Sequence, residues 1–256
     1  VGGGPAGLMA AEVLAETGAA AVHLYDAMPS VGRKFLLAGK GGLNLTHGEP
    51  LPAFVQRYGA RAAAVAPWLD AFGPDAARVW AAGLGIDTFV GTSGRVFPTD
   101  LKAAPLLRAW LHRLRERGVV FHMRQRWLGF GGDGGALRFA TPHGEASVQP
   151  QATVLALGGA SWPQLGSDGA WVPWLREAGV EVAPLAPANC GFEVAWSDHL
   201  RQRFAGAPIK PVVLRLGDAF ERQGEFVLSE YGLEGSLVYA ASALIRDAIA
   251  ARGPAT

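Results

Sequence analysis

A glycine-rich run at the start of the chain constrains its fold more than any other feature. Gly2, Gly4 and Gly7 form the pattern Gly-x-Gly-x-x-Gly, with Pro5 and Ala6 between the second and third glycines. In dinucleotide-binding folds these glycines turn the chain from a strand into a helix and let the backbone approach a pyrophosphate. The pyrophosphate lies at the helix N-terminus, where N–H groups and the helix dipole favour negative charge. The run therefore predicts a bound dinucleotide, with only the last residue of the preceding strand expected in this sequence.

The residues after the glycines strengthen this prediction. Residues 5–17 have the pattern of a helix ending at Gly18, and residues 21–26 that of a short buried strand ending in Asp26. Asp26 lies 19 residues past Gly7, close to the spacing at which a carboxylate accepts hydrogen bonds from an adenosine ribose. The order strand, glycine turn, helix, strand, acid predicts an α/β fold of the Rossmann type.

The composition limits the partners, metal sites and location that can be expected for this protein. The 256 residues are 50% hydrophobic and carry a formal net charge of +1, so we expect a large core and no nucleic-acid partner. The single Cys190 excludes an internal disulfide, and the six histidines are scattered, so we expect no metal site. No apolar stretch approaches the roughly 20 residues that span a bilayer. We therefore expect a cytoplasmic protein without a membrane partner.

Along the chain, periodicity predicts the remaining elements. A glycine-rich loop over 30–47 precedes helices at 52–58, 61–72 and 75–82, a hairpin at 88–97 and an amphipathic helix at 101–117. Short strands follow over 119–148, broken by a glycine-rich turn at 131–135; an apolar strand over 153–159 ends in two glycines, and a helix covers 171–178. We place a domain boundary near 184–187, giving domains 1–186 and 187–256. The second domain should hold strands near 191–196, 212–216 and 225–229 and a helix at 237–251.

The apolar strand predicted over 153–159, which ends in Gly158 and Gly159, helps to distinguish two kinds of dinucleotide-binding enzyme. A simple nicotinamide dehydrogenase would continue with regular βα units after Asp26, whereas this chain continues with a long glycine-rich loop. Two-dinucleotide flavoproteins bring a second strand end, such as Gly158 and Gly159, back beside the first. This arrangement favours FAD over a nicotinamide cofactor alone.

Four sequence blocks together resemble the BaiN/RdsA-like NAD(P)/FAD-dependent oxidoreductases, a family of the aminoacetone-oxidase type. The blocks cover residues 2–7, residues 32–34 with 39–47, residues 157–163, and residues 224–226 with 231–236. The second block is the most specific, although the family's Gly-Gly-Arg-Cys-Asn is here Gly41-Gly42-Leu43-Asn44, without the cysteine. The resemblance extends over essentially the whole chain.

This resemblance implies a glutathione-reductase-type FAD-binding Rossmann domain interrupted by an inserted β-rich domain with a helical part. The chain is then expected to lack the first strand and the C-terminal return segment of the FAD domain. The implied cofactor-binding residues belong to the glycine run, the ribose acid, the basic loop, the flavin-side loop, the adenine-side strand and the second glycine tip. They are Gly2, Gly4, Pro5, Ala6 and Gly7; Asp26; Arg33 and Lys34; Gly41, Gly42, Asn44 and Thr46; Trp127; and Gly158, Gly159 and Ser161.

The resulting prediction is an FAD-dependent oxidoreductase that transfers a hydride between the flavin and a small organic substrate or NAD(P)H. A nicotinamide-only dehydrogenase and a flavin-binding module without turnover remain the alternatives. No catalytic acid or base is identified. His47 is better explained as a surface or capping residue, and Cys190, without a second cysteine, as a small apolar side chain.

Overall fold

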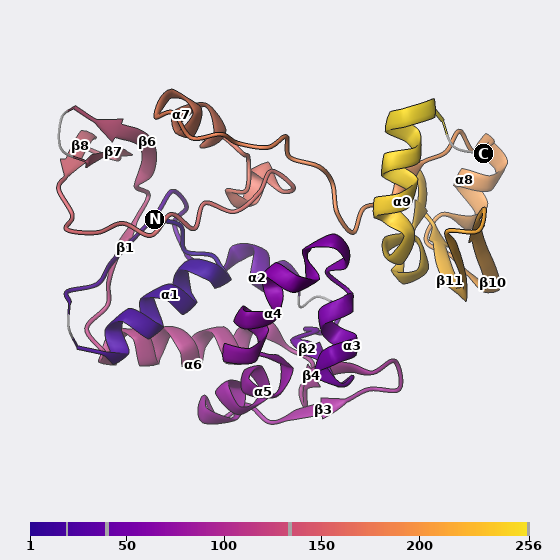
Figure 1. Cartoon of the computed structure of the whole chain (residues 1–256), viewed down its shortest axis with the longest axis horizontal. Coiled ribbons are helices and arrows are strands. Elements are labelled where there is room, and N and C mark those ends of the chain that lie inside the picture. The colour runs from indigo at the N-terminus through magenta and orange to yellow at the C-terminus, as the bar shows by residue number, and fades with distance from the viewer. Residues whose placement is uncertain (19, 39–40, 133–134, 255–256) are drawn as a thin grey trace. The chain divides into compact units, whose positions relative to one another are not determined.

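A computed structural model describes residues 1–18, 20–38, 41–132 and 135–254, which form two compact units (Figure 1). The first unit is Val1–Val182 and the second is Ala183–Thr256. Gly39 and Lys40 of the second sequence block, and Asp133 and Gly134 of the predicted turn, lie outside the described residues.

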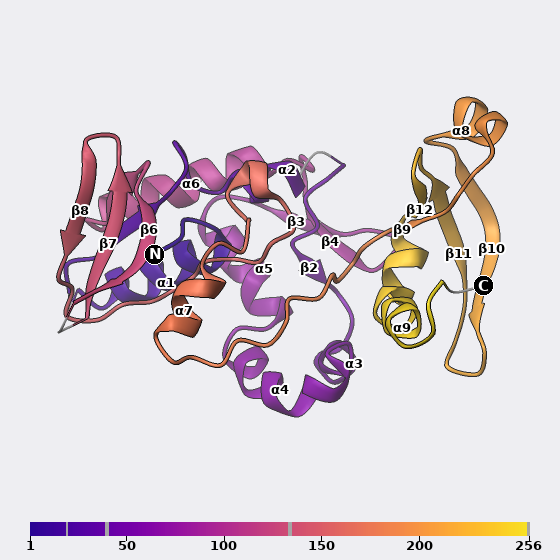
Figure 2. The ribbon, with the colours of Figure 1, turned by 90° about the horizontal axis from the view of Figure 1, so that it is seen from above.

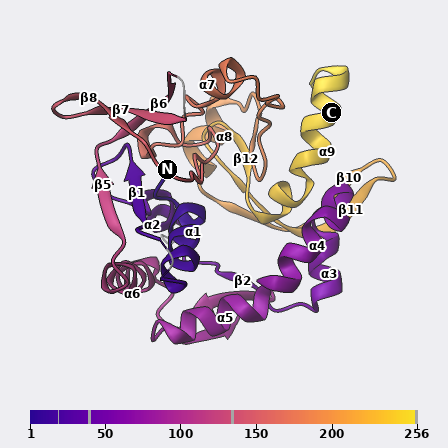
Figure 3. The same cartoon turned by 60° about the vertical axis from the view of Figure 1, so that its left-hand side comes forward.

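The first unit is built around a parallel strand pair covered by two helices. Strand β1 (His23–Asp26) pairs in parallel with β5 (Val120–Met123), and the two strands are neighbours in Figure 3. Helix α1 (Pro5–Glu16) and helix α6 (Ala103–Glu116) share one buried cluster with these strands. The amphipathic helix predicted for 101–117 is α6, whose buried face includes Leu107, Trp110 and Leu114.

The segment 153–159 differs from its prediction as a buried strand, because the structure forms no regular strand there. The Ala156 N–H donates to the Val1 carbonyl at 2.8 Å, and the Val1 amino group donates to the Val154 carbonyl at 2.7 Å. Two bonds to one residue are too few for a ladder, and Val154 remains 48% exposed. The segment nevertheless lies directly beside the glycine turn, as expected.

Two antiparallel sheets complete the first unit. Strands β6 (Arg126–Gly131), β7 (Ala136–Thr141) and β8 (Gly144–Val148) form a meander, in which Trp127 and Phe139 pack with Leu137; Figure 2 shows the three strands side by side. The other sheet has the order β2–β4–β3 and includes the predicted hairpin. Its strands are β2 (Thr46–His47), β3 (Thr88–Val90) and β4 (Arg95–Pro98).

Further helices lie between or after these strands in the chain. One of them, α2 (Arg33–Ala38), lies inside the stretch predicted as a glycine-rich loop. The others occupy the predicted helical regions and are α3 (Leu51–Gln56), α4 (Ala62–Ala71), α5 (Pro74–Gly83) and α7 (Val172–Glu177), with 3₁₀ turns at Gly59–Arg61 and Pro163–Leu165.

The second unit is a four-stranded antiparallel sheet of order β10–β11–β12–β9 with two helices. Helix α9 packs on β11, and its buried residues include Leu237, Val238 and Ala241. The elements are α8 (Asp198–Phe204), β9 (Phe192–Glu193), β10 (Pro208–Leu216), β11 (Phe220–Leu228), β12 (Gly232–Glu234) and α9 (Ser236–Arg252). Among the described residues of both units, none of the helices combines the length and apolar character needed to cross a membrane.

Candidate functional site

The glycine run makes the turn into helix α1. The Gly2 N–H donates to the Tyr25 carbonyl at 2.8 Å, which joins the turn to β1, and Pro5 occupies the first helical position. Gly2 has a φ of +103°, and a Cβ there would lie 2.2 Å from the Ala156 carbonyl oxygen. A Cβ at Gly7 would lie 1.8 Å from the Gly2 carbonyl oxygen. Both glycines are therefore required by close backbone packing.

Gly4 has a different environment. A Cβ added to it would meet no protein atom within 4 Å. Gly4 is the N-cap of α1, the end of the helix at which the first N–H groups have no partner within the helix. The absence of a side chain here keeps that space open for a ligand.

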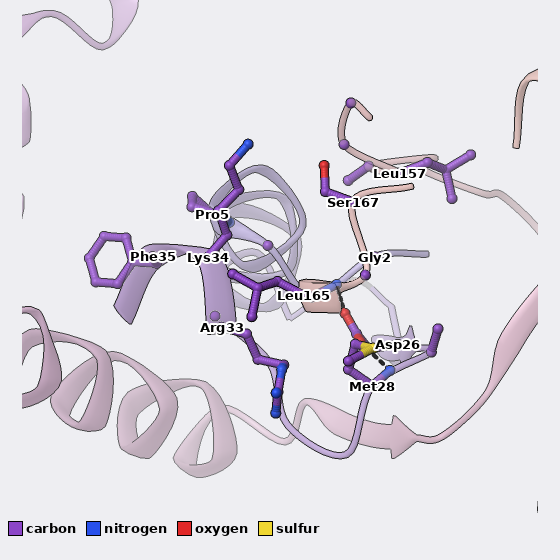
Figure 4. Close-up of a pocket in the computed structure, with 18 of the residues that line it drawn as sticks. Gly2, Pro5, Asp26, Met28, Arg33, Lys34, Phe35, Leu157, Leu165 and Ser167 are labelled. Carbon is purple, nitrogen blue, oxygen red and sulfur yellow. Dashed lines mark hydrogen bonds between the residues drawn. The ribbon is translucent and has the colours of Figure 1, made fainter. Parts of the chain in front are cut away.

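The Asp26 side chain, at the end of β1, links the glycine turn to the loop that follows β1. Its Oδ2 accepts a hydrogen bond from the Gly3 N–H at 2.6 Å, and its Oδ1 accepts one from the Met28 N–H at 2.7 Å. Figure 4 shows Asp26 and Met28 together beside Gly2. A carboxylate oxygen can accept more than one hydrogen bond, so Asp26 retains the capacity to accept one from a ligand hydroxyl.

The two glycine tips predicted to converge do lie together. Gly2 packs against Ala156, just before Gly158 and Gly159. Lys34, in α2, donates from Nζ to the Ser161 hydroxyl, just after the same tip. Residues more than 120 positions apart in the sequence thus form one local structure.

A cavity of about 530 Å³ opens between these tips, within the range of about 300–1,000 Å³ typical of small-molecule sites. Ten of the predicted cofactor-binding residues line it: Gly2, Gly4, Pro5, Asp26, Arg33, Lys34, Asn44, Trp127, Gly158 and Gly159. Six lie outside its lining: Ala6, Gly7, Gly41, Gly42, Thr46 and Ser161. Of these six, Gly7 packs inside the turn, Ser161 bonds to the cavity residue Lys34, and Thr46 pairs with Val96 in the small sheet.

The β6 end of the cavity is aromatic and carries an ion pair. Trp127 is only 3% exposed and packs edge-to-face on Trp174, with ring centroids 5.5 Å apart. Arg126 donates to Asp168 at 2.9 Å. Burial raises the pKa of Asp168, but hydrogen bonds from the Ala170 N–H and Arg126 outweigh it and hold that pKa below its usual value. Asp168 is therefore an ionised, already paired group at this end.

Unpartnered buried polar atoms concentrate at this cavity. Within the part of the chain that the structure describes, five side chains have one, and four of these line the cavity: Arg33 (Nε), Trp127 (Nε1), Ser167 (Oγ) and Trp171 (Nε1). A buried polar group without a partner costs about 1–3 kcal/mol. Guanidinium and indole N–H groups can only donate, so the cavity fits a ligand rich in acceptors, such as the phosphates and ring nitrogens of an adenine dinucleotide.

Sequence reasoning missed part of this lining. Ser167, Trp171 and Trp174 follow the second glycine tip but were not predicted as site residues. The only sequence signal for them is their closeness to Gly158 and Gly159. No group of three or more His, Cys, Asp or Glu within the described ranges is arranged to hold a metal ion.

A histidine pair supports Tyr25, a residue of the cavity wall. His23 Nδ1 lies 2.9 Å from His122 Nε2, and Tyr25 stacks on His122 with ring centroids 4.3 Å apart. Burial, followed by the nearby charge of His23, lowers the pKa of His122.

The lowered pKa of His122 predicts a pH-dependent stability. The unfolded chain, with a histidine pKa of about 6.5, binds this proton more readily than the folded chain. The free energy of unfolding should therefore fall as pH drops from about 6.5 through the folded pKa. Urea unfolding at a series of pH values should show this slope, and His122→Phe should flatten it. Equal slopes in both proteins would contradict the assignment.

Comparisons with known proteins find one family model and a distant curated relative. A family model described as HI0933-like protein Rossmann domain matches residues 1–241. A curated relative, the 3-dehydro-bile acid delta(4,6)-reductase of Clostridium scindens, is 28% identical over 254 residues, covering 93% of this chain and 58% of the relative. The chain thus spans a little over half the length of that relative.

Two solved structures have a distant similarity. Thermovibrio ammonificans THI4 gives a TM-score of 0.43 at 16% identity, covering 70% of this chain and 61% of that one. CabE, an aromatic hydroxylase from angucycline biosynthesis, gives a TM-score of 0.43 at 16% identity, covering 96% of this chain and 47% of that one.

Proposed function

Because this chain belongs to the HI0933-like Rossmann-domain family, we propose that it binds FAD and forms part of an FAD-dependent oxidoreductase. The match confirms the resemblance predicted from the sequence blocks. We further propose that residues 1–186 are the FAD-binding domain. Residues 187–256, with their antiparallel sheet, are proposed as part of an inserted substrate domain.

The observation that carries this proposal is that the Gly2–Gly7 turn and the Gly158–Gly159 pair meet at one cavity, whose wall carries unpartnered hydrogen-bond donors. Gly4 leaves open space at the N-terminus of α1, and Gly158 and Gly159 line the same cavity. The four unpartnered buried polar atoms in its wall support a polar ligand that extends over several elements. A pyrophosphate-linked dinucleotide has this extent and this chemistry.

Different residues would bind different parts of the cofactor. The α1 N-terminus and Gly4 would hold the pyrophosphate, Asp26 would accept from the adenosine ribose, and Trp127 would lie at the adenine. Arg33 and Lys34 supply positive charge at the cavity wall. Asn44 would lie toward the flavin, with Gly41, Gly42 and Thr46 supporting that loop. When bound, FAD supplies a ring that takes up or releases a hydride; this chain's residues orient it and balance its charge.

The substrate is proposed to be a small organic molecule, with NADH or NADPH as a candidate electron donor. The relative's name identifies a reductase of a 3-dehydro-bile acid, which supports a small-molecule substrate here without specifying its class. The cytoplasmic location and the absence of a nucleic-acid partner expected from the sequence also stay part of this proposal.

Anaerobic rapid mixing tests the proposed activity. The FAD-loaded protein is mixed with NADH, NADPH or a candidate organic reductant, and the visible flavin absorbance is followed. Bleaching, with recovery on adding an acceptor, is the expected result. A protein that takes up no FAD during loading, stays colourless and binds NADH would favour the nicotinamide-only dehydrogenase. A yellow protein that none of these reductants bleaches would favour the module without turnover.

A further inference from the structure

We infer that Ser167 binds the cofactor directly, by donating its hydroxyl hydrogen to an acceptor atom in the adenosine diphosphate half. This inference rests on the proposed FAD function and adds a binding residue that the glycine motifs do not include. Ser167 is 8% exposed, lines the cavity, and has an Oγ without a hydrogen-bond partner among the described residues. A buried hydroxyl usually has such a partner, so a ligand is the natural candidate.

The loop that carries Ser167 holds it in a fixed position. The Trp162 N–H donates to the Ser167 carbonyl and the Ser167 N–H donates to the Trp162 carbonyl, both at 3.1 Å. The backbone groups of Ser167 are thus paired, and only its side chain lacks a partner. Gly166, with a φ of +87°, makes the turn before it possible.

Contacts of this loop indicate which half of the cofactor it faces. A Cβ on Gly166 would lie 2.8 Å from Met28 Cγ, so the loop packs against the residue whose N–H bonds Asp26. On its other side, Asp168 pairs with Arg126, next to Trp127. The ribose acid and the proposed adenine-side strand therefore flank the loop.

The position of the hydroxyl agrees with this placement. Ser167 Oγ would lie 3.6 Å from a Cβ built on Gly158, and Figure 4 draws Ser167 near Leu157 on the second glycine tip. The other unpartnered cavity groups, on Arg33, Trp127 and Trp171, are donors only. Asp168, the next residue in the chain, already accepts from Arg126 and the Ala170 N–H. The ligand portion at this end must supply acceptors, so the hydroxyl acts as a donor.

Ser167→Ala tests this inference through two effects with opposite signs. The affinities for FAD and for ADP, measured by isothermal titration, should each fall about 3–10-fold, as expected for the loss of one hydrogen bond. The affinity for riboflavin, which lacks the whole adenosine diphosphate half, should not change. In the ligand-free protein, the thermal midpoint should stay the same or rise, because an unsatisfied buried hydroxyl has been removed. A purely structural serine would instead lower that midpoint.

Ser242→Ala is the matched control. Ser242 is 3% exposed, but its hydroxyl already donates to the Tyr239 carbonyl at 2.9 Å within α9. This variant should lower the thermal midpoint and leave FAD affinity unchanged. Trp171→Phe, which keeps the ring and removes the N–H, should weaken FAD and ADP binding as Ser167→Ala does.

The outcomes separate this inference from the proposed function. Wild-type protein that binds FAD, together with a Ser167→Ala variant of equal FAD and ADP affinity, would overturn the role of Ser167 alone. Wild-type protein that is folded and binds no FAD would overturn the proposed function itself.

Discussion

Replacing Glu12 with alanine is expected to lower the free energy of unfolding by about 3–5 kcal/mol, the cost of breaking a buried ion pair from one side. Glu12 lies in α1, one turn past the glycine run, and is 5% exposed. Its Oε1 accepts from Arg113 at 2.8 Å, and its Oε2 accepts from Trp110 at 2.6 Å and Trp80 at 3.0 Å. Removing the carboxylate leaves two indole N–H groups and one N–H of Arg113 without this acceptor, while Arg113 keeps its bond to the Gly83 carbonyl.

The network also gives Glu12 a pH signature. Burial alone would raise its pKa, but the hydrogen bonds from Arg113, Trp80 and Trp110 and the charge of Arg113 outweigh burial, so the pKa is lowered. A lowered carboxyl pKa stabilises the fold above the unfolded value of about 4.3. This stabilisation should be lost as pH falls through the folded pKa, and Glu12→Gln should remove that loss.

Glu16→Ala is the control for Glu12→Ala. Glu16 lies one turn further along the same helix, contacts Arg117 at 3.8 Å and has a side chain that is 68% exposed. Exposed pairs contribute about 0–1 kcal/mol, so its substitution should change stability little. Urea denaturation of both variants checks the pair. Similar small losses in both would contradict the buried network.

Gly4→Ala is expected to weaken FAD binding at least about tenfold, or about 1.4 kcal/mol, with the fold intact. The new methyl group would contact no protein atom within 4 Å, and Gly4 is one of the residues that line the cavity. Gly4 has a φ of −79° and ψ of −179°, which alanine adopts without strain. The cost to folding should stay near the ~1 kcal/mol of a poorer N-cap.

Gly7→Ala gives the contrasting result at the same turn. Its methyl group would lie 1.8 Å from the Gly2 carbonyl oxygen, so the turn must open. We expect a loss of about 3 kcal/mol or more in stability, at the upper end of overpacking effects. FAD titration and thermal unfolding of both variants distinguish the two effects. Gly4→Ala should mainly weaken FAD binding, and Gly7→Ala should mainly lower stability. Normal FAD affinity in Gly4→Ala would place the cofactor elsewhere.

The sequence predicted the parts of the site that depend on local chain geometry. The glycine turn, helix α1, strand β1 and its terminal acid follow from spacing alone, and the structure forms all of them. The second tip could be predicted because its paired glycines are unusual at the end of an apolar run. The prediction of a regular strand over 153–159 was wrong. Strand formation depends on pairing with distant segments, which the local sequence does not encode.

The parts that sequence reasoning missed depend on contacts between distant residues. Glu12 was not distinguished in the predicted helix, because its indole partners lie 68 and 98 residues away. Helix α2 was hidden by the glycines on either side of Arg33–Ala38. The role inferred for Ser167 arises from a hydroxyl that lacks a partner after folding, and no local pattern encodes such a lack.

The most direct test of the central claim is a titration of the full chain with FAD by calorimetry, followed by competition with ADP. We predict one FAD per chain, displaced by ADP. Both glycine segments and the unpartnered donors of the cavity wall are proposed to bind one and the same dinucleotide. A chain that unfolds cooperatively, and is therefore folded, yet takes up no FAD would contradict this account.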